Sequence, residues 1–286
     1  MDDSDVHALI EDIVGRLRPV AGVAAIALGG SRARGTATPR SDVDLALYYA
    51  PESPLDLDEL QRVAQAVDEE HRMGLLTAIG GWGPWINGGG WLHVRGMPVD
   101  FLYRDLHQVA TAIQQCRAGD ITIAYQPGHP HGFLTSIYLA EAALCRILWD
   151  PHDALQGLKA RTAPYPPLLK RALIEKFSWE AGFALQNARK GALYADLVYV
   201  AGCCFRSVSC LLQTLFALNE RYWMNEKGAL ALAATFLQSP QRLAERVTGV
   251  FASLSDHEDR LLAAIQALDD LVRETAGLLK EEPGPR

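Results

Sequence analysis

The sequence predicts an α/β (α+β) core with a mixed sheet, followed by an all-α helical-bundle domain. Two apolar runs, residues 23–28 and 45–49, have the length and composition of buried strands. From residue 133 onward, apolar side chains recur at spacings of three and four, which is the period of amphipathic helices. We therefore place an N-terminal domain at residues 1–127 and a helical C-terminal domain at residues 128–286.

The N-terminal domain begins with an amphipathic helix over residues 6–17, which the Arg18-Pro19 pair ends. After the two apolar strands, Asp56 can cap a helix that extends to about residue 72. The remaining expected elements of this domain are strands at 91–94 and 99–103 joined by a turn at 95–98, a helix at 106–117 and an edge strand at 121–125.

Helices account for almost all of the C-terminal domain in this prediction. The breaks between them carry turn and helix-stop residues such as Asp-Pro, Pro-Tyr-Pro-Pro, Asn-Glu and Ser-Pro. Segments with this spacing and these short breaks pack as a bundle. The expected helices span residues 133–149, 153–160, 167–192, 195–221, 226–237, 240–254 and 256–279.

Composition is that of a soluble globular chain of 286 residues, with 49% hydrophobic and 21% charged residues. No apolar run reaches the roughly 18 residues needed to span a bilayer, and the N-terminus is acidic, unlike a signal peptide. The five cysteines form no C-x-x-C pair and have no ligand spacing with histidine. We expect a cytoplasmic protein with reduced thiols and no membrane contact.

Charge is distributed unevenly along the chain. Residues 1–120 hold 17 acidic side chains against ten arginines and no lysine, whereas the remainder is balanced. Proteins that bind duplex nucleic acid normally present a basic face, because the phosphate backbone dominates their affinity. We therefore expect no duplex nucleic acid as a partner.

A glycine turn follows the first apolar run. Gly29 and Gly30 allow the backbone to turn sharply and to approach a ligand closely. Ser31 adds a hydroxyl at the expected start of a helix, where free N–H groups favour phosphate. Gly-Gly-Ser by itself is also a common turn.

Three acids mark the second run and a later strand. Asp42 and Asp44 are two residues apart, so on a strand they project from the same face. Neighbouring carboxylates repel unless a cation lies between them, and oxygen ligands suit Mg²⁺. Asp100 is the single acid of the apolar segment Val99–Tyr103, where a buried carboxylate needs a cation or strong donors. The alternative for Asp42 and Asp44 is a simple turn cap.

The order Gly29-Gly30-Ser31, Asp42-x-Asp44 and then Asp100 resembles the polymerase-β-like nucleotidyltransferase superfamily. More narrowly, the chain is similar to bacterial nucleotidyltransferase-domain proteins with a helical C-terminal half, a layout shared by aminoglycoside and lincosamide nucleotidyltransferases. The superfamily motifs cover roughly the first 105 residues. The narrower resemblance also takes in the segments 83–89, 128–133 and 218–223.

The resemblance implies transfer of NMP from an NTP, ATP foremost, to the hydroxyl of a small-molecule acceptor, with Mg²⁺ or Mn²⁺ as cofactor. Asp42, Asp44 and Asp100 would bind the metal and carry out catalysis, while Gly29, Gly30 and Ser31 would hold the phosphates. The alternative is an antitoxin-like or protein-modifying nucleotidyltransferase that acts on a protein partner. A homodimer, the acceptor and the preferred base are left open.

Weaker candidates surround these motifs. Arg32 and Arg34 can neutralise a triphosphate, or form a solvated basic loop. Residues 80–90 hold six glycines and two tryptophans, with Trp91 just beyond; the aromatics either pin a surface loop or stack on a substrate ring, and Trp85 is the candidate acceptor contact. Glu141, on an apolar helix, either reaches the acceptor, as a general base in place of Asp100, or faces solvent.

Overall fold

The computed structural model describes residues 3–280 and divides the chain into two compact units. The first, here called the sheet unit, comprises the residues up to Gln115 together with 123–128 and 132–164. The second, the helical unit, comprises residues 116–122, 129–131 and the chain from Tyr165 onward. The chain thus passes between the units several times, and the division into two domains at 127/128 stays a prediction.

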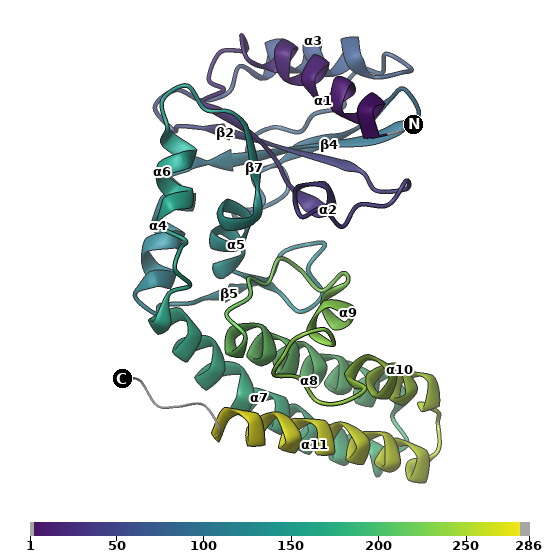
Figure 1. The fold of residues 1–286 in the computed structure, drawn as a ribbon. Helices are drawn as coiled ribbons and strands as arrows, with labels where there is room; N and C mark the ends of the chain where they lie inside the picture. The colour runs from purple at the N-terminus through teal and green to yellow at the C-terminus, as the bar shows by residue number, and fades with distance from the viewer. Residues whose placement is uncertain (1–2, 281–286) are drawn as a thin grey trace. The chain divides into compact units, whose positions relative to one another are not determined.

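A five-stranded mixed sheet forms the centre of the sheet unit, with the strand order β3-β4-β2-β1-β7 (Figure 1). The central pair β2 and β4 is parallel and every other pair is antiparallel. The predicted fold class, a mixed sheet followed by helices, is confirmed. The strands are β1 (Ala25–Leu28), β2 (Val43–Tyr49), β3 (Gly89–Val94), β4 (Met97–Asp105) and β7 (Arg146–Trp149), and a separate two-stranded sheet joins β5 (Ile123–Ala124) to β6 (Phe133–Leu134).

The predicted helix over residues 133–149 is wrong at both ends. Only Ser136–Leu144 is helical (α5), and it lies between the short strand β6 and the strand β7. β7 pairs antiparallel with β1, which would otherwise be a sheet edge. Hydrogen bonding to that edge therefore outweighed the local helical spacing, because unpaired strand groups are costly when they are covered.

Helices α1 (Asp3–Leu17) and α3 (Leu57–Val67) cover one face of the sheet (Figure 1). The predicted cap of α3 is confirmed, since the Asp56 carboxylate accepts from the Glu59 N–H at 2.9 Å. Alternate side chains of β2 and β4 fill the core beneath these helices, and full burial of each large one contributes about 1.5–3 kcal/mol. These side chains are Val43, Leu45, Leu47, Tyr49, Val99, Phe101 and Tyr103.

The opposite face of the sheet carries polar side chains, among them Arg104 of β4. Arg104 of β4 is buried there, and both oxygens of Glu141 on α5 accept hydrogen bonds from its guanidinium at 2.7 Å. Arg104 also donates to the Tyr103 carbonyl at 2.9 Å. Such a buried ion pair is tolerated because nearly all of its hydrogen-bonding groups are satisfied.

The helical unit is built on two long helices, α7 (Pro167–Ala192) and α8 (Leu197–Leu218), with α11 (Glu258–Lys280) packed against both. By length and composition α8 could cross a membrane, but 72% of its most apolar window is buried, as in the central helix of a bundle. Of the predicted helix over 226–237, only α9 (Ala229–Ala233) forms. The other helices are α2 (Gly30–Ala33), α4 (Leu106–Arg117), α6 (Ala154–Ala160) and α10 (Leu243–Ser253).

The edge strand β3 is fixed to the end of α3 by one buried acid. Asp68 accepts two hydrogen bonds from the Arg72 side chain, at 2.6 and 3.0 Å, and one from the His93 N–H at 3.0 Å. The Arg72 hydrogen bonds, with help from the His93 amide, hold the pKa of this carboxyl well below its usual range although burial opposes them. Asp68 therefore ties the C-terminal end of β3 to the end of α3.

Asp68→Asn should lower the free energy of unfolding by about 2 kcal/mol at pH 7, the size expected for charged hydrogen bonds. Because the folded-state pKa of Asp68 is depressed, its contribution is fully present above the unfolded pKa of about 4 and is lost as the pH falls below it. Urea titrations at several pH values should therefore show the two proteins converging in acid. The control Glu70→Gln removes an exposed neighbour of Arg72 and should cost under about 0.5 kcal/mol; an equal loss in both variants would contradict this account.

Candidate active site

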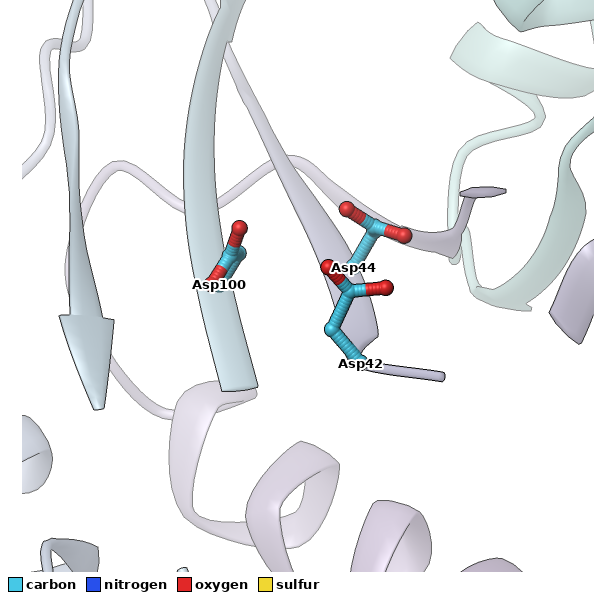
Figure 2. Close-up of side chains that lie close together, drawn as sticks. All are labelled: Asp42, Asp44 and Asp100. Atoms are coloured by element: carbon cyan, nitrogen blue, oxygen red, sulfur yellow. The ribbon is translucent and has the colours of Figure 1, made fainter. Parts of the chain in front are cut away.

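Three carboxylates meet on the polar face of the sheet, at one end of the central strand pair. Asp44 of β2 lies directly opposite Asp100 of β4, and Asp42 precedes β2 by one residue. One oxygen from each of the three lies within 4.8 Å of the others, and all three side chains are half-buried. Figure 2 shows Asp44 on β2, Asp100 on the neighbouring strand β4 and Asp42 on the segment that leads into β2. The structure thus brings together all three predicted acids.

Arg32 braces the segment that carries Asp42. Its Nε donates to the Asp42 carbonyl at 2.9 Å and its Nη2 donates to the Ser41 carbonyl at 2.6 Å. A guanidinium that holds two successive carbonyls fixes the path of the chain into β2. In this structure Arg32 therefore positions the acids, and its predicted contact with phosphate stays a prediction.

The glycine turn lies against Asp44. The Gly29 N–H donates to the Asp44 carbonyl at 2.9 Å, which continues the β1–β2 ladder. Gly30 has φ +61°, in the left-handed region, and a Cβ placed on it would lie 1.8 Å from Oδ2 of Asp44. Only glycine fits there without moving the carboxylate. Ser31 follows in the short helix α2.

The donor set fits a hard divalent cation. Three carboxylates supply only oxygen ligands, which Mg²⁺ and Mn²⁺ prefer over nitrogen and sulfur. Like charges held this close repel one another, and a cation among them removes the repulsion. The missing Cβ at Gly30 also makes room for the Asp44 carboxylate, which lies where that Cβ would be. In the part of the chain that the structure describes, no other group of three acidic, histidine or cysteine side chains has this geometry.

The family described as "Nucleotidyltransferase domain" matches residues 8–77, which include the glycine turn, Asp42 and Asp44. The chain contains a nucleotidyltransferase domain. The resemblance inferred from the motifs is thereby confirmed, and so is the predicted enzyme class, a nucleotidyltransferase. Asp100 lies beyond the matched residues and joins the domain's acids through the β2–β4 register.

Comparison with curated proteins gives no match. Among solved structures, the chain is similar to a nucleotidyltransferase-like protein from Exiguobacterium sibiricum 255-15, with 13% sequence identity and a TM-score of 0.41. That likeness covers 95% of this chain and 78% of the other.

The three weaker candidates, Arg34, Glu141 and Trp85, contact other parts of the protein in this structure. Arg34 is exposed and its Nε donates to the Gly30 carbonyl at 3.2 Å. Glu141 neutralises Arg104, whose Cα lies about 13 Å along β4 from that of Asp100. Trp85 stacks on Phe133 with ring centroids 5.6 Å apart, and its carbonyl accepts from a tyrosine hydroxyl of α5. These contacts favour the pinning role for Trp85; an acceptor contact by either Trp85 or Glu141 stays a prediction.

Sequence reasoning missed that Trp91 shares a face with the acids. β3 and β4 are joined by the two-residue turn Arg95-Gly96, with φ +52° and +76°, and this turn sets Trp91 opposite Asp100. The predicted turn over residues 95–98 is therefore two residues too long. A two-residue loop ending in glycine is the commonest hairpin connection, so the signal was present and would have given the correct register.

Gly30→Ala should weaken divalent-metal binding at least tenfold, because the new methyl group displaces the Asp44 carboxylate. Gly35→Ala is the matched control: Gly35 has a similar φ of +69° but nothing within 4 Å of its Cβ position. Both variants should lose about 1 kcal/mol of stability through backbone strain, and only Gly30→Ala should lose metal. Mn²⁺ titration followed by electron paramagnetic resonance measures the binding; similar affinities in both variants would refute the steric argument.

Proposed function

We propose that this chain transfers a nucleoside monophosphate, AMP from ATP foremost, to a hydroxyl of a small-molecule acceptor. The observation that carries the proposal is the Asp42, Asp44 and Asp100 cluster at a nucleotidyltransferase domain. When bound there, Mg²⁺ or Mn²⁺ would neutralise phosphate charge and make the acceptor hydroxyl more acidic. Nucleotidyl transfer needs that chemistry, since the reacting phosphate is itself negatively charged.

Each side chain has a distinct role in this proposal. Asp42, just before β2, and Asp44 of β2 would hold the divalent ion, with Arg32 keeping the segment of Asp42 in place. Asp100 completes the site on β4 and is the acid that faces the incoming hydroxyl. The backbone at Gly30 and Ser31 takes the β- and γ-phosphates, since this turn lies directly against the Asp44 carboxylate.

The reaction is a displacement at the α-phosphorus. The acceptor oxygen forms a bond to that phosphorus, and the bond to the bridging oxygen breaks, so that pyrophosphate leaves with the electron pair. The proton of the hydroxyl passes to a base, for which Asp100 is the nearest candidate. The attacking hydroxyl oxygen and the leaving pyrophosphate oxygen lie roughly in line through the α-phosphorus. The acceptor and the pyrophosphate portion of the nucleotide therefore occupy opposite sides of the acids.

The acidic character of the N-terminal half favours a small acceptor over duplex nucleic acid, because residues 1–120 carry no lysine and an excess of acids. The assay that identifies the acceptor uses labelled ATP, GTP, CTP and UTP with Mg²⁺ or Mn²⁺. Each is incubated with pools of aminoglycosides, metabolites and proteins, and the labelled product is found by chromatography and mass spectrometry. Label on no compound in any pool would contradict the proposed transfer.

One observation favours the second candidate function, action on a protein partner. Large apolar side chains are exposed along α7, α8 and the connection between them, and exposed apolar patches of this kind often mark protein contacts. Trp179 and Phe183 stack there with centroids 5.0 Å apart. The exposed residues are Trp179, Phe183, Leu193, Tyr194, Val198 and Tyr199. Label that appears on a protein and on no small molecule would select this alternative.

Asp42→Asn combined with Asp44→Asn should abolish Mg²⁺-dependent binding of ATP and leave the fold intact, because the carboxylates are half-buried and not part of the core. Isothermal titration calorimetry measures the affinity, and circular dichroism checks the fold. Asp58→Asn, which removes one charge from the exposed side of α3, is the control and should bind normally. Wild-type affinity in the double variant would disprove the site assignment.

Asp100→Asn should separate chemistry from binding. Asp42 and Asp44 can still hold the nucleotide, so the Kd for Mg·ATP should change less than tenfold. Single-turnover transfer should fall at least a hundredfold, since the variant loses both a metal ligand and the proton acceptor. Before the acceptor is known, slow hydrolysis of ATP to AMP and pyrophosphate serves as the readout. Near-normal turnover would rule out the three-carboxylate mechanism.

A further inference from the structure

Two tryptophans stand on the same face of the sheet as the acids. Trp91 of β3 lies directly opposite Asp100 of β4, and opposed residues of antiparallel strands project to the same face, with Cβ atoms about 5 Å apart. The next residue, Leu92, points to the core and is buried, which confirms the alternation. Trp91 is therefore the cross-strand neighbour of Asp100 on the face that carries the acids.

Trp82 stacks on Trp91. Their ring centroids are 4.6 Å apart and the ring planes differ by 23°. Trp91 nevertheless remains 61% exposed, so Trp82 covers only part of it and a large π surface stays open. An exposed tryptophan of this size buries little area on folding and contributes little to stability.

The loop that carries Trp82 is built to hold it there. The Gln126 side-chain amide, itself buried, donates to the Trp82 carbonyl at 2.6 Å. Gly89, on the same face as Trp91, leaves room for Trp82: a Cβ on Gly89 would lie 3.1 Å from the Trp82 ring and 1.8 Å from the Phe101 carbonyl oxygen. Trp85, in contrast, packs against Phe133 and is used as an anchor. The loop thus presents one aromatic pair and packs its other aromatic ring against Phe133.

Strand order places this pair on the attacking side of the reaction. The glycine turn follows β1, the acids lie on β2 and β4, and Trp91 lies on β3 in the order β3-β4-β2-β1. The triphosphate and the aromatic pair are therefore separated by the acids. Because the nucleophile and the leaving group lie roughly in line, a leaving group at the turn puts the acceptor beside Trp91.

We propose that the Trp82–Trp91 pair is the acceptor subsite, and that the acceptor is a ring-bearing alcohol whose ring stacks on Trp91 while its hydroxyl faces Asp100. This inference rests on the proposed nucleotidyl transfer and narrows its substrate class. Acyclic alcohols, and serine or threonine hydroxyls on a protein, offer no ring to stack and are poor acceptors. Trp91 is then a specificity-determining residue.

The test uses the full chain saturated with Mg²⁺ and the unreactive analogue α,β-methylene-ATP. Uridine and methyl glucoside are the ring-bearing probes, and glycerol is the acyclic probe. Saturation-transfer NMR titrations give a Kd for each. The ring-bearing probes should bind and glycerol should not, and Trp91→Ala should weaken ring binding about tenfold or more, as expected for loss of a stacking contact. Trp91→Phe keeps an aromatic face and should retain most of the affinity.

The matched control is Trp179→Ala, which removes an equally exposed and stacked tryptophan from the helical unit and should leave ring binding unchanged. Equal affinities in Trp91→Ala, Trp179→Ala and the wild type, or no binding of either ring-bearing probe by the wild type, would overturn the inference. If Trp91→Ala misfolds, Trp91→Leu against Trp91→Phe makes the same comparison. Calorimetry measures binding of the nucleotide analogue in parallel. If the wild type does not bind the analogue, the proposed function is contradicted. If the analogue binds normally but the probes bind equally well with and without the Trp91 ring, only the acceptor subsite is contradicted.

Discussion

Parallel pairing between β2 and β4 is the interaction on which the site depends. Each strand carries large apolar side chains on one face and an acid on the other, with Asp44 opposite Asp100. A slip of one residue would turn carboxylates into the core beneath α1 and α3 and expose the apolar set. Burial of the apolar face therefore fixes the register, and the register places the carboxylates close together.

Packing around the acids then keeps them in a usable arrangement. Arg32 holds the chain where it enters β2, and Gly30 allows the turn to approach Asp44. Farther along the same face, Arg104 and Glu141 form a satisfied ion pair that needs no further ligand. The face is thus divided: one end is internally neutralised, whereas the other concentrates the negative charge of three carboxylates.

Aromatic residues of the 80–91 segment are likewise divided between structure and surface. Trp85 packs with Phe133, and Gln126 ties the loop to the sheet unit. Trp82 and Trp91 stay on the surface next to Asp100. Amino-acid composition could not distinguish an anchoring tryptophan from a substrate-contacting one, because a glycine-rich loop with tryptophans has the same composition in both cases.

The sequence by itself determined the mixed sheet, most helices and the three acids, because these depend on local periodicity and on residue types with few other uses in apolar strands. Only the tertiary structure decided the secondary structure of residues 146–149. These residues form a strand that pairs with β1, although the spacing of apolar residues in their segment suits a helix. It also decided that Glu141 meets Arg104 and that Trp91 faces Asp100. These outcomes depend on hydrogen bonds and packing between segments distant in the chain, and no local pattern records which distant segment will be the partner.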